Sequence, residues 1–116
     1  MTELIACLSE DHGTKLHVER VIDGLEWEKV FIIASEKQVL NTKKEAEFIL
    51  IDLKKTIPKL IEYLKHILKN KITGTEIALN LVSGSGKEHM AILSALLKLG
   101  LGIRFVALTK QGVKEI

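Results

Sequence analysis

Two short polar segments carry the residues of this sequence that are best suited to chemistry. Residues 9–14 and 83–87 each follow an apolar run, and the second segment contains Gly84, Gly86 and Lys87. Glycines let a backbone turn sharply and come close to a bound group. The free amides and the dipole at the start of a following helix favour an anion such as phosphate, to which Lys87 could add a full positive charge. In the alternative interpretation, the glycines serve only a tight turn and Lys87 lies in solvent.

Neither segment matches the common nucleotide-binding motifs. A P-loop needs a glycine five residues before the Gly-Lys pair and a Ser or Thr after it, and these positions hold Leu81 and Glu88. The dinucleotide fingerprint needs three spaced glycines after the first strand, where Gly13 stands alone. The sequence therefore gives poor support to P-loop ATP hydrolysis and to NAD chemistry, and no cofactor is expected.

The sequence also gives little support to a metal site or to a nucleophilic cysteine. The four histidines are scattered along the chain: His12, His17, His66 and His89. No Cys-x-x-Cys or His-Glu-x-x-His pattern is present, so no metal site is expected, although Asp11-His12 and His89 could meet across a shared site. Cys7 is the only cysteine and lies in an apolar run, which favours a small buried core residue.

Apolar runs alternate with helical periodicities along the chain, as is typical of α/β proteins. The polar stretch 35–44 could hold a short helix, and the tail 109–116 could fray or add a short edge element. The last helix is apolar almost all round and is expected to be deeply buried. Strands are predicted at 4–8, 29–34, 48–53, 76–82 and 103–108, and helices at 14–25, from Thr56 to about Leu68, and at 88–99.

These elements predict one Rossmann-like domain over residues 1–116. Continuous apolar strands indicate a sheet covered on both faces, hence a three-layer sandwich with a mainly parallel sheet of five or six strands. Right-handed crossovers join the parallel strands, and the expected strand order is 3-2-1-4-5. In such sheets a ligand binds where the strand order reverses, here between the first and fourth strands. Segments 9–14 and 83–87 follow those two strands, so we expect them to form a ligand site together.

Composition narrows the class of protein further. Of 116 residues, 47% are hydrophobic and 28% are charged, which suits a globular domain. The formal net charge of +2 gives no strong case for DNA or membrane binding. No apolar run approaches the roughly 20 residues of a membrane-spanning helix. The N-terminus lacks the features of a signal peptide, so a cytoplasmic location is expected.

The fourth-strand region resembles the signature of CRISPR-associated Rossmann-fold (CARF) domains. Residues 80–100 read NLVSGSGKEHMAILSALLKLG, an apolar strand, a Gly- and Ser-rich turn with a lysine, then a methionine and an apolar helix that ends in glycine. Aligned on Met90, Lys87 falls where many members have threonine. Aligned on Lys87, the methionine comes one residue late. The role of Lys87 therefore stays open, and the family fold commonly has six strands.

The resemblance implies a homodimer that binds a ring-shaped oligoadenylate second messenger across its two-fold axis, as a CRISPR-linked sensor. Each subunit would supply the same two loops to the symmetric ring. The residues expected to bind the ligand are Ser9, Glu10, Asp11, His12, Gly13, Thr14, Ser83, Gly84, Ser85, Gly86, Lys87 and Met90.

The resemblance also extends to ring nucleases, which degrade the messenger without a metal. In that reaction the ribose 2′-hydroxyl attacks its own phosphodiester while the protein holds the geometry and stabilises the developing charge. Matching the family pattern, Ser9 would orient the phosphodiester and Lys87 would stabilise the transition state. His12 would act as acid or base.

Two alternatives from other classes remain open. One is a Rossmann-like enzyme or binding protein for a phosphorylated small metabolite, since fold does not fix function. The other is a regulatory subunit whose lysine-rich surface, including Lys37, Lys43 and Lys44, contacts RNA or protein. Trp27 and Tyr63 are isolated, so no sequence-specific DNA binding is expected.

Overall fold

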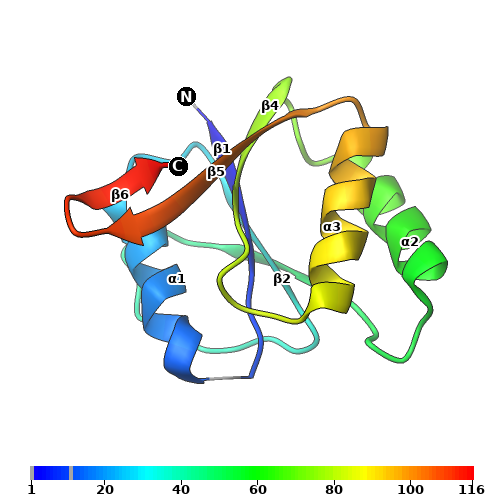
Figure 1. Cartoon of the computed structure of the whole chain (residues 1–116), viewed down its shortest axis with the longest axis horizontal. Helices are drawn as coiled ribbons and strands as arrows, with labels where there is room; N and C mark the ends of the chain where they lie inside the picture. The colour runs from blue at the N-terminus through cyan, green and yellow to red at the C-terminus, as the bar shows by residue number, and fades with distance from the viewer. Residues whose placement is uncertain (1, 11) are drawn as a thin grey trace.

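A computed structural model describes residues 2–10 and 12–116 of the protein, without the side chain of His12. Strands and helices alternate along most of the chain, and the last two strands form a hairpin (Figure 1). The elements are β1 (Glu3–Cys7), α1 (His12–Gly24), β2 (Val30–Ala34), β3 (Glu47–Leu50), α2 (Ile57–Lys69), β4 (Glu76–Asn80), α3 (Gly86–Lys98), β5 (Gly102–Thr109) and β6 (Gly112–Glu115).

One six-stranded sheet runs through the molecule in the order β3-β2-β1-β4-β5-β6. The first five strands pair in parallel, and β6 pairs antiparallel with β5. The predicted Rossmann-like α/β fold and its strand order are therefore confirmed. The sixth strand comes from the polar tail, where Gly112 has a φ of +97° that suits the tight turn back from β5.

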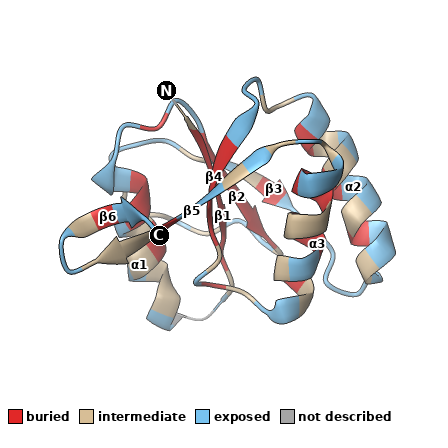
Figure 2. Ribbon diagram, turned by 45° about the horizontal axis from the view of Figure 1, so that its top comes forward, coloured by how far each residue is buried: buried red, intermediate tan, exposed pale blue. Residues whose placement is uncertain are grey.

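Helices cover both faces of the sheet, with α1 on one side and α2 and α3 on the other (Figures 1 and 2). All five residues of β1 and all five of β2 are buried, as expected for central strands covered on both faces. Alternate residues of these strands enter two different cores. One core contains Ile5, Ile33 and Leu79 with the buried faces of α2 and α3, and the other contains Leu4 and Ile32 with α1.

The segment from 35 to 46 contains no helix. The short helix that the polar stretch 35–44 could have held is therefore not formed. Side chains of α1 hold the backbone of this segment instead. Glu19 Oε2 accepts a hydrogen bond from Asn41 N, and the Asp23 carboxylate accepts from Lys43 N at 3.0 and 3.1 Å. The crossover from β2 to β3 is therefore an irregular segment fixed to the surface of α1.

The expectation that α3 is deeply buried is wrong for one of its faces. Ala91, Ile92 and Ala95 are fully buried, but Met90 is 62% exposed and Leu97 is 63% exposed. The reason is that α3 is the last helix of its layer, and β5 and β6 extend beyond it (Figure 1). Within the described part of the chain, no helix is long and apolar enough to cross a membrane.

Candidate functional site

The loops after β1 and β4 meet at the side chain of Ser83, which is completely buried. Ser83 Oγ accepts hydrogen bonds from Ser9 N at 2.8 Å and from Thr14 Oγ1 at 2.8 Å, and it lies 3.0 Å from Ser9 Oγ. Three hydroxyl groups and one backbone amide thus converge at the point where the strand order reverses. The structure brings together the two segments that topology and composition indicated.

The start of α3 is closed by a capping box between Ser85 and Glu88. Glu88 Oε1 accepts from Ser85 N at 2.9 Å, and Ser85 Oγ accepts from Glu88 N at 3.4 Å. The buried Glu88 carboxylate lies at the positive end of the helix dipole, a place that an anionic ligand would also favour. Gly86 N–H and Lys87 N–H are the first-turn amides that this capping box does not use.

Sequence reasoning missed Glu88 as part of this site. The signal was present, because Ser85-Gly-Lys-Glu88 has the Ser-x-x-Glu spacing of a capping box. The effect of the box is to fix the first residue of α3 at Gly86, two residues before the predicted start.

Gly84 allows the loop to pass directly over the end of β1. Its φ is +102°, and a Cβ atom there would come within 2.6 Å of Cys7 Sγ. Cys7 Sγ in turn donates to Glu88 Oε2 over 3.4 Å. Burial and the nearby Glu88 carboxylate raise the pKa of Cys7, so the thiol stays protonated. Cys7 is a buried core residue and is unsuited to act as a nucleophile.

Lys87 extends away from the Ser9–Ser83–Thr14 cluster. Its Nζ donates to the backbone carbonyl of Leu53 over 2.7 Å, in the loop between β3 and α2. The ammonium therefore ties the start of α3 to a loop 34 positions earlier in the sequence. A direct contact between this ammonium and a ligand at Ser9 would require Lys87 to leave Leu53.

Two histidines lie close to the cluster, and each is held by a bond to Nε2. His89 Nε2 lies 2.8 Å from the carbonyl oxygen of Ser83, and a carbonyl can only accept, so this nitrogen carries the proton. His17 Nε2 lies 3.2 Å from Asn80 Nδ2, which donates to it, so here Nε2 is the acceptor. Burial lowers the pKa of His17. Of these two histidines, the sequence pointed only to His89, as a residue that could meet Asp11 and His12 across the site.

A pocket of about 410 Å³ lies beside the first loop. Glu10 and Glu36 both line it, and hydrogen bonding to the Glu10 carboxyl group, together with the repulsion between the two carboxylates, raises the pKa of Glu36. Gln38 Nε2 donates to the carbonyl of Ser9 over 3.0 Å, which fixes the pocket against the Ser83 cluster. Lys15 and Val39 complete the lining. Carboxylates in this position can accept hydrogen bonds from the amino group of a ligand.

Glu36 and Gln38 were also not among the site residues predicted from the sequence. They lie in the irregular segment after β2, and they reach the site because β2 is the neighbour of β1 in the sheet. The sequence around them shows no motif, so only the strand order could have indicated them.

Three more of the expected site residues are exposed. Glu10 lines the pocket beside the first loop, Gly13 lies in the first turn of α1, and Met90 is exposed on α3 rather than directed into the Ser83 cluster. Asp11 and the side chain of His12 lie outside the described residues. Among the side chains that the structure describes, no group of three or more His, Cys, Asp or Glu residues could hold a metal ion.

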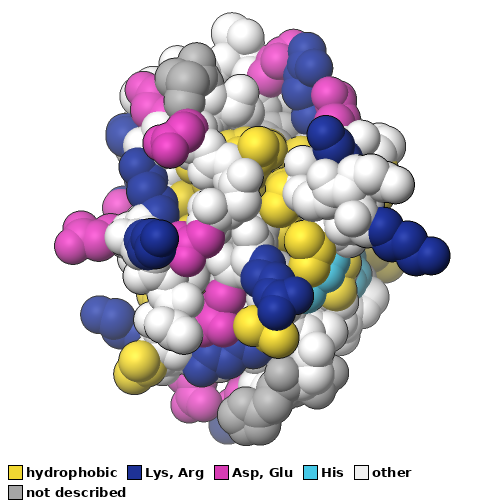
Figure 3. Space-filling model, turned by 90° about the vertical axis from the view of Figure 1, so that its left-hand side faces the viewer, with side chains coloured by type: hydrophobic (Ala, Val, Ile, Leu, Met, Phe, Trp, Pro, Cys, Tyr) yellow, Lys and Arg dark blue, Asp and Glu magenta, His cyan; other side chains and the backbone are white. Residues whose placement is uncertain are grey.

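The surface formed by α1 and the β5–β6 hairpin carries charges of both signs. Lysine and arginine side chains alternate there with carboxylates and with hydrophobic side chains (Figure 3). This face therefore does not present the continuous basic patch that a phosphate backbone favours.

Comparisons with protein-family models, with curated proteins and with solved structures found no match for this chain.

Proposed function

We propose that the protein is a sensor domain that binds a cyclic oligoadenylate at the meeting point of the loops after β1 and β4. The observation that carries this proposal is the bonding of Ser9 and Thr14 to the buried Ser83 hydroxyl. These bonds join two polar loops at the reversal point of a parallel sheet, where ligands of such folds bind. The resemblance of residues 80–100 to CARF domains supplies the ligand class.

The site offers different groups to the two parts of such a ligand. Phosphodiester oxygens would accept from Gly86 N–H and Lys87 N–H, the first-turn amides outside the capping box. An adenine would enter the pocket beside the first loop, where the carboxylates of Glu10 and Glu36 can accept from its exocyclic amine. The acidic side of the site would thus take the base and the helix start would take the phosphate.

The proposal includes a homodimer, because one ring must meet two copies of the site. An apolar surface suited to self-association lies on α3 and on the neighbouring end of the sheet. Phe105 is paired with Leu79, which faces α3, so Phe105 lies on the α3 side of β5, beyond the cover of that helix. The exposed apolar residues of these elements, called here the α3–β5 surface, are Met90 and Leu97 on α3, Phe105 on β5, Val82 after β4 and Ile116 after β6.

Binding is better supported than cleavage. The resemblance gives the Lys87 ammonium the role of stabilising the developing negative charge, and Lys87 Nζ is bonded to the Leu53 carbonyl. Cleavage by that route would require ligand binding to draw Lys87 away from Leu53.

The test is incubation of the protein with labelled cyclic tetra- and hexa-adenylate in EDTA, with binding and products measured together. We expect saturable binding of one ring, weakened about tenfold or more by Glu36→Ala, which removes an acceptor for the adenine amine. Glu26→Ala, at an exposed carboxylate just past α1, is the matched control. Linear products that disappear in Lys87→Ala would add ring cleavage to the binding function. No binding of either ring would overturn the proposal.

A further inference from the structure

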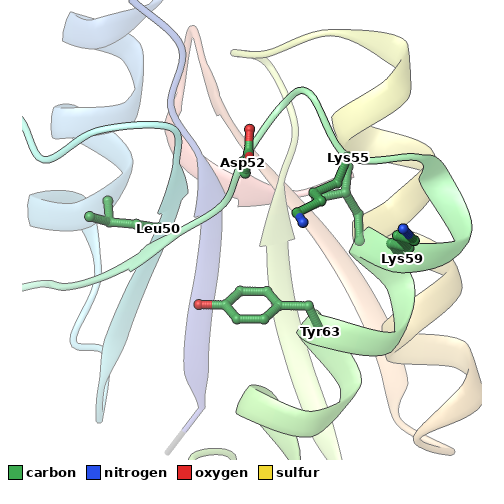
Figure 4. Close-up of a pocket in the computed structure, with 6 residues that line it drawn as sticks. Leu50, Asp52, Lys55, Lys59 and Tyr63 are labelled. Carbon is green, nitrogen blue, oxygen red and sulfur yellow. The ribbon is translucent and has the colours of Figure 1, made fainter.

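A second cavity lies at the edge of the sheet, between the end of β3 and the first turns of α2 (Figure 4). Its volume is about 400 Å³, within the range of about 300–1,000 Å³ that is usual for small-molecule sites. The lining residues are Leu50, Asp52, Lys55, Lys59, Leu60 and Tyr63. None of these residues belongs to the Ser83 cluster or to the pocket beside it.

The walls of this cavity suit a flat apolar group. Leu60 is buried, whereas the Tyr63 side chain is 43% exposed. Figure 4 shows the Tyr63 ring extending from α2 toward the edge strand β3. Leu50 borders the cavity from β3, but its side chain lies on the other face of the sheet, since Leu50 is paired with Ala34 of the α1-side core. An exposed aromatic ring face can stack on a nucleobase.

The charged groups of the cavity suit an anion. Lys59 precedes Tyr63 by one helical turn on α2, and Lys55 lies in the loop just before the helix. Among the described residues neither ammonium forms an ion pair, in contrast to Lys71, which pairs with Glu47. Two unpaired ammonium groups beside an apolar wall match a phosphate monoester, which carries nearly two negative charges.

Asp52 adds a fixed acceptor at the rim of the cavity. Its Oδ1 accepts a hydrogen bond from Lys54 N at 3.0 Å, which holds the carboxylate in place. The second oxygen can accept from a hydroxyl group of a ligand. The cavity therefore presents, on one ligand-sized surface, a ring face, a pair of cations and one acceptor.

We propose that this cavity binds a nucleoside 5′-monophosphate. The base lies against the Tyr63 ring, the phosphate contacts Lys55 and Lys59, and a ribose hydroxyl donates to Asp52. This inference goes beyond the proposed function and does not require it, because the cavity uses separate residues.

The chain contains a single tyrosine, which makes the cavity directly observable. In protein carrying ¹³C-labelled tyrosine, the ring signals report only on Tyr63. We expect adenosine 5′-monophosphate to shift these signals saturably. Adenosine, which lacks the phosphate, and ribose 5-phosphate, which lacks the base, should each bind about tenfold more weakly or worse. An unshifted ring at low-millimolar nucleotide, or equal binding of adenosine, would overturn the proposal.

Two variants separate the cavity from general charge effects. Replacing both Lys55 and Lys59 by glutamine should raise the Kd for the monophosphate about tenfold or more. Lys69→Gln, on the last turn of α2, removes a charge from the same helix outside the cavity and should leave the Kd unchanged. Equal effects of the two sets of changes would contradict a site at Tyr63. The labelled tyrosine spectrum without nucleotide shows whether each variant is folded.

Discussion

At the scale of single residues, His17 links α1 to the β4–β5 part of the sheet through one ring nitrogen. Its Nε2 accepts from Asn80 Nδ2 and, over 3.5 Å, from Leu108 N, and both bonds require that nitrogen to be unprotonated. Burial lowers the pKa of His17 from 6.5 in the folded state. As the pH falls below about 6.5, the unfolded chain takes up a proton at this residue more readily than the native protein. The free energy of unfolding should therefore fall with decreasing pH in that range.

Urea unfolding between about pH 5 and 8 measures this effect. His17→Gln removes the titrating group and should flatten the decline below pH 6.5. His66→Gln, on the exposed side of α2, is the control and should retain it. A decline of the same size in His17→Gln as in the unchanged protein would contradict this role.

Gly84 and Gly86 lie two residues apart, one in the loop after β4 and the other at the start of α3, and they differ in the space around them. Alanine at 84 would meet Cys7 Sγ at 2.6 Å and would adopt a strained φ of +102°, whereas nothing lies within 4 Å of a Cβ at 86. Gly84→Ala should lower the free energy of unfolding by about 3 kcal/mol. Gly86→Ala should leave it unchanged or raise it by up to about 1 kcal/mol, since alanine favours the helix. Chemical denaturation of both variants checks this, and similar losses would show that the loop is not as close to Cys7 as described.

At the scale of elements, the irregular crossover after β2 depends on the end of α1. Asp23 lies in the last turn of α1, where a carboxylate is unfavourable to the helix dipole, yet it accepts bonds from Lys43 N and Lys44 N. Asp23→Ala should lower the free energy of unfolding by about 1 kcal/mol and speed hydrogen exchange of those two amides. Glu26→Ala, just past the helix, is the control. Unchanged exchange at 43 and 44 would refute this anchoring.

The elements that sequence reasoning located well are those whose own pattern decides them. Buried strands read as continuous apolar runs, and α2 shows its stripe of Leu60, Leu64 and Leu68. The segment 35–46 carries no such pattern, because its conformation is set by Glu19 and Asp23 on another element. The burial of α3 was also misjudged, because an apolar helix does not reveal that its layer ends beside it.

At the scale of the whole molecule, strand order could be predicted because alternating strands and helices allow few right-handed topologies. That order was enough to bring the Ser9 and Ser83 loops together. It was not enough to place Lys87 on the Leu53 carbonyl, or Glu36 beside Glu10. Those contacts depend on the conformations of single side chains and of the loops that carry Leu53, Glu10 and Glu36, for which the sequence carries no periodic signal.

The α3–β5 surface leads to a prediction about the assembled protein. Met90 and Leu97 lie two helical turns apart on the exposed side of α3, and Phe105 is exposed on the same side of the sheet as α3. Apolar side chains gathered in this way mark an interaction surface, and a two-fold axis lets one surface cover its own copy. We expect light scattering to give the mass of two chains for the unchanged protein. The double change Met90→Lys and Leu97→Lys should give one chain with the same circular dichroism.

Leu16→Lys is the control, because Leu16 is exposed to a similar degree on α1, on the opposite face of the sheet. This variant should remain dimeric. If the oligoadenylate binds across the two-fold axis, the Met90 and Leu97 double variant should also lose ring binding, although the Ser83 cluster within each chain is intact. A double variant that stays dimeric would exclude the α3–β5 surface as the interface. One that is monomeric and still binds the ring with unchanged affinity would show that a single copy of the site is sufficient.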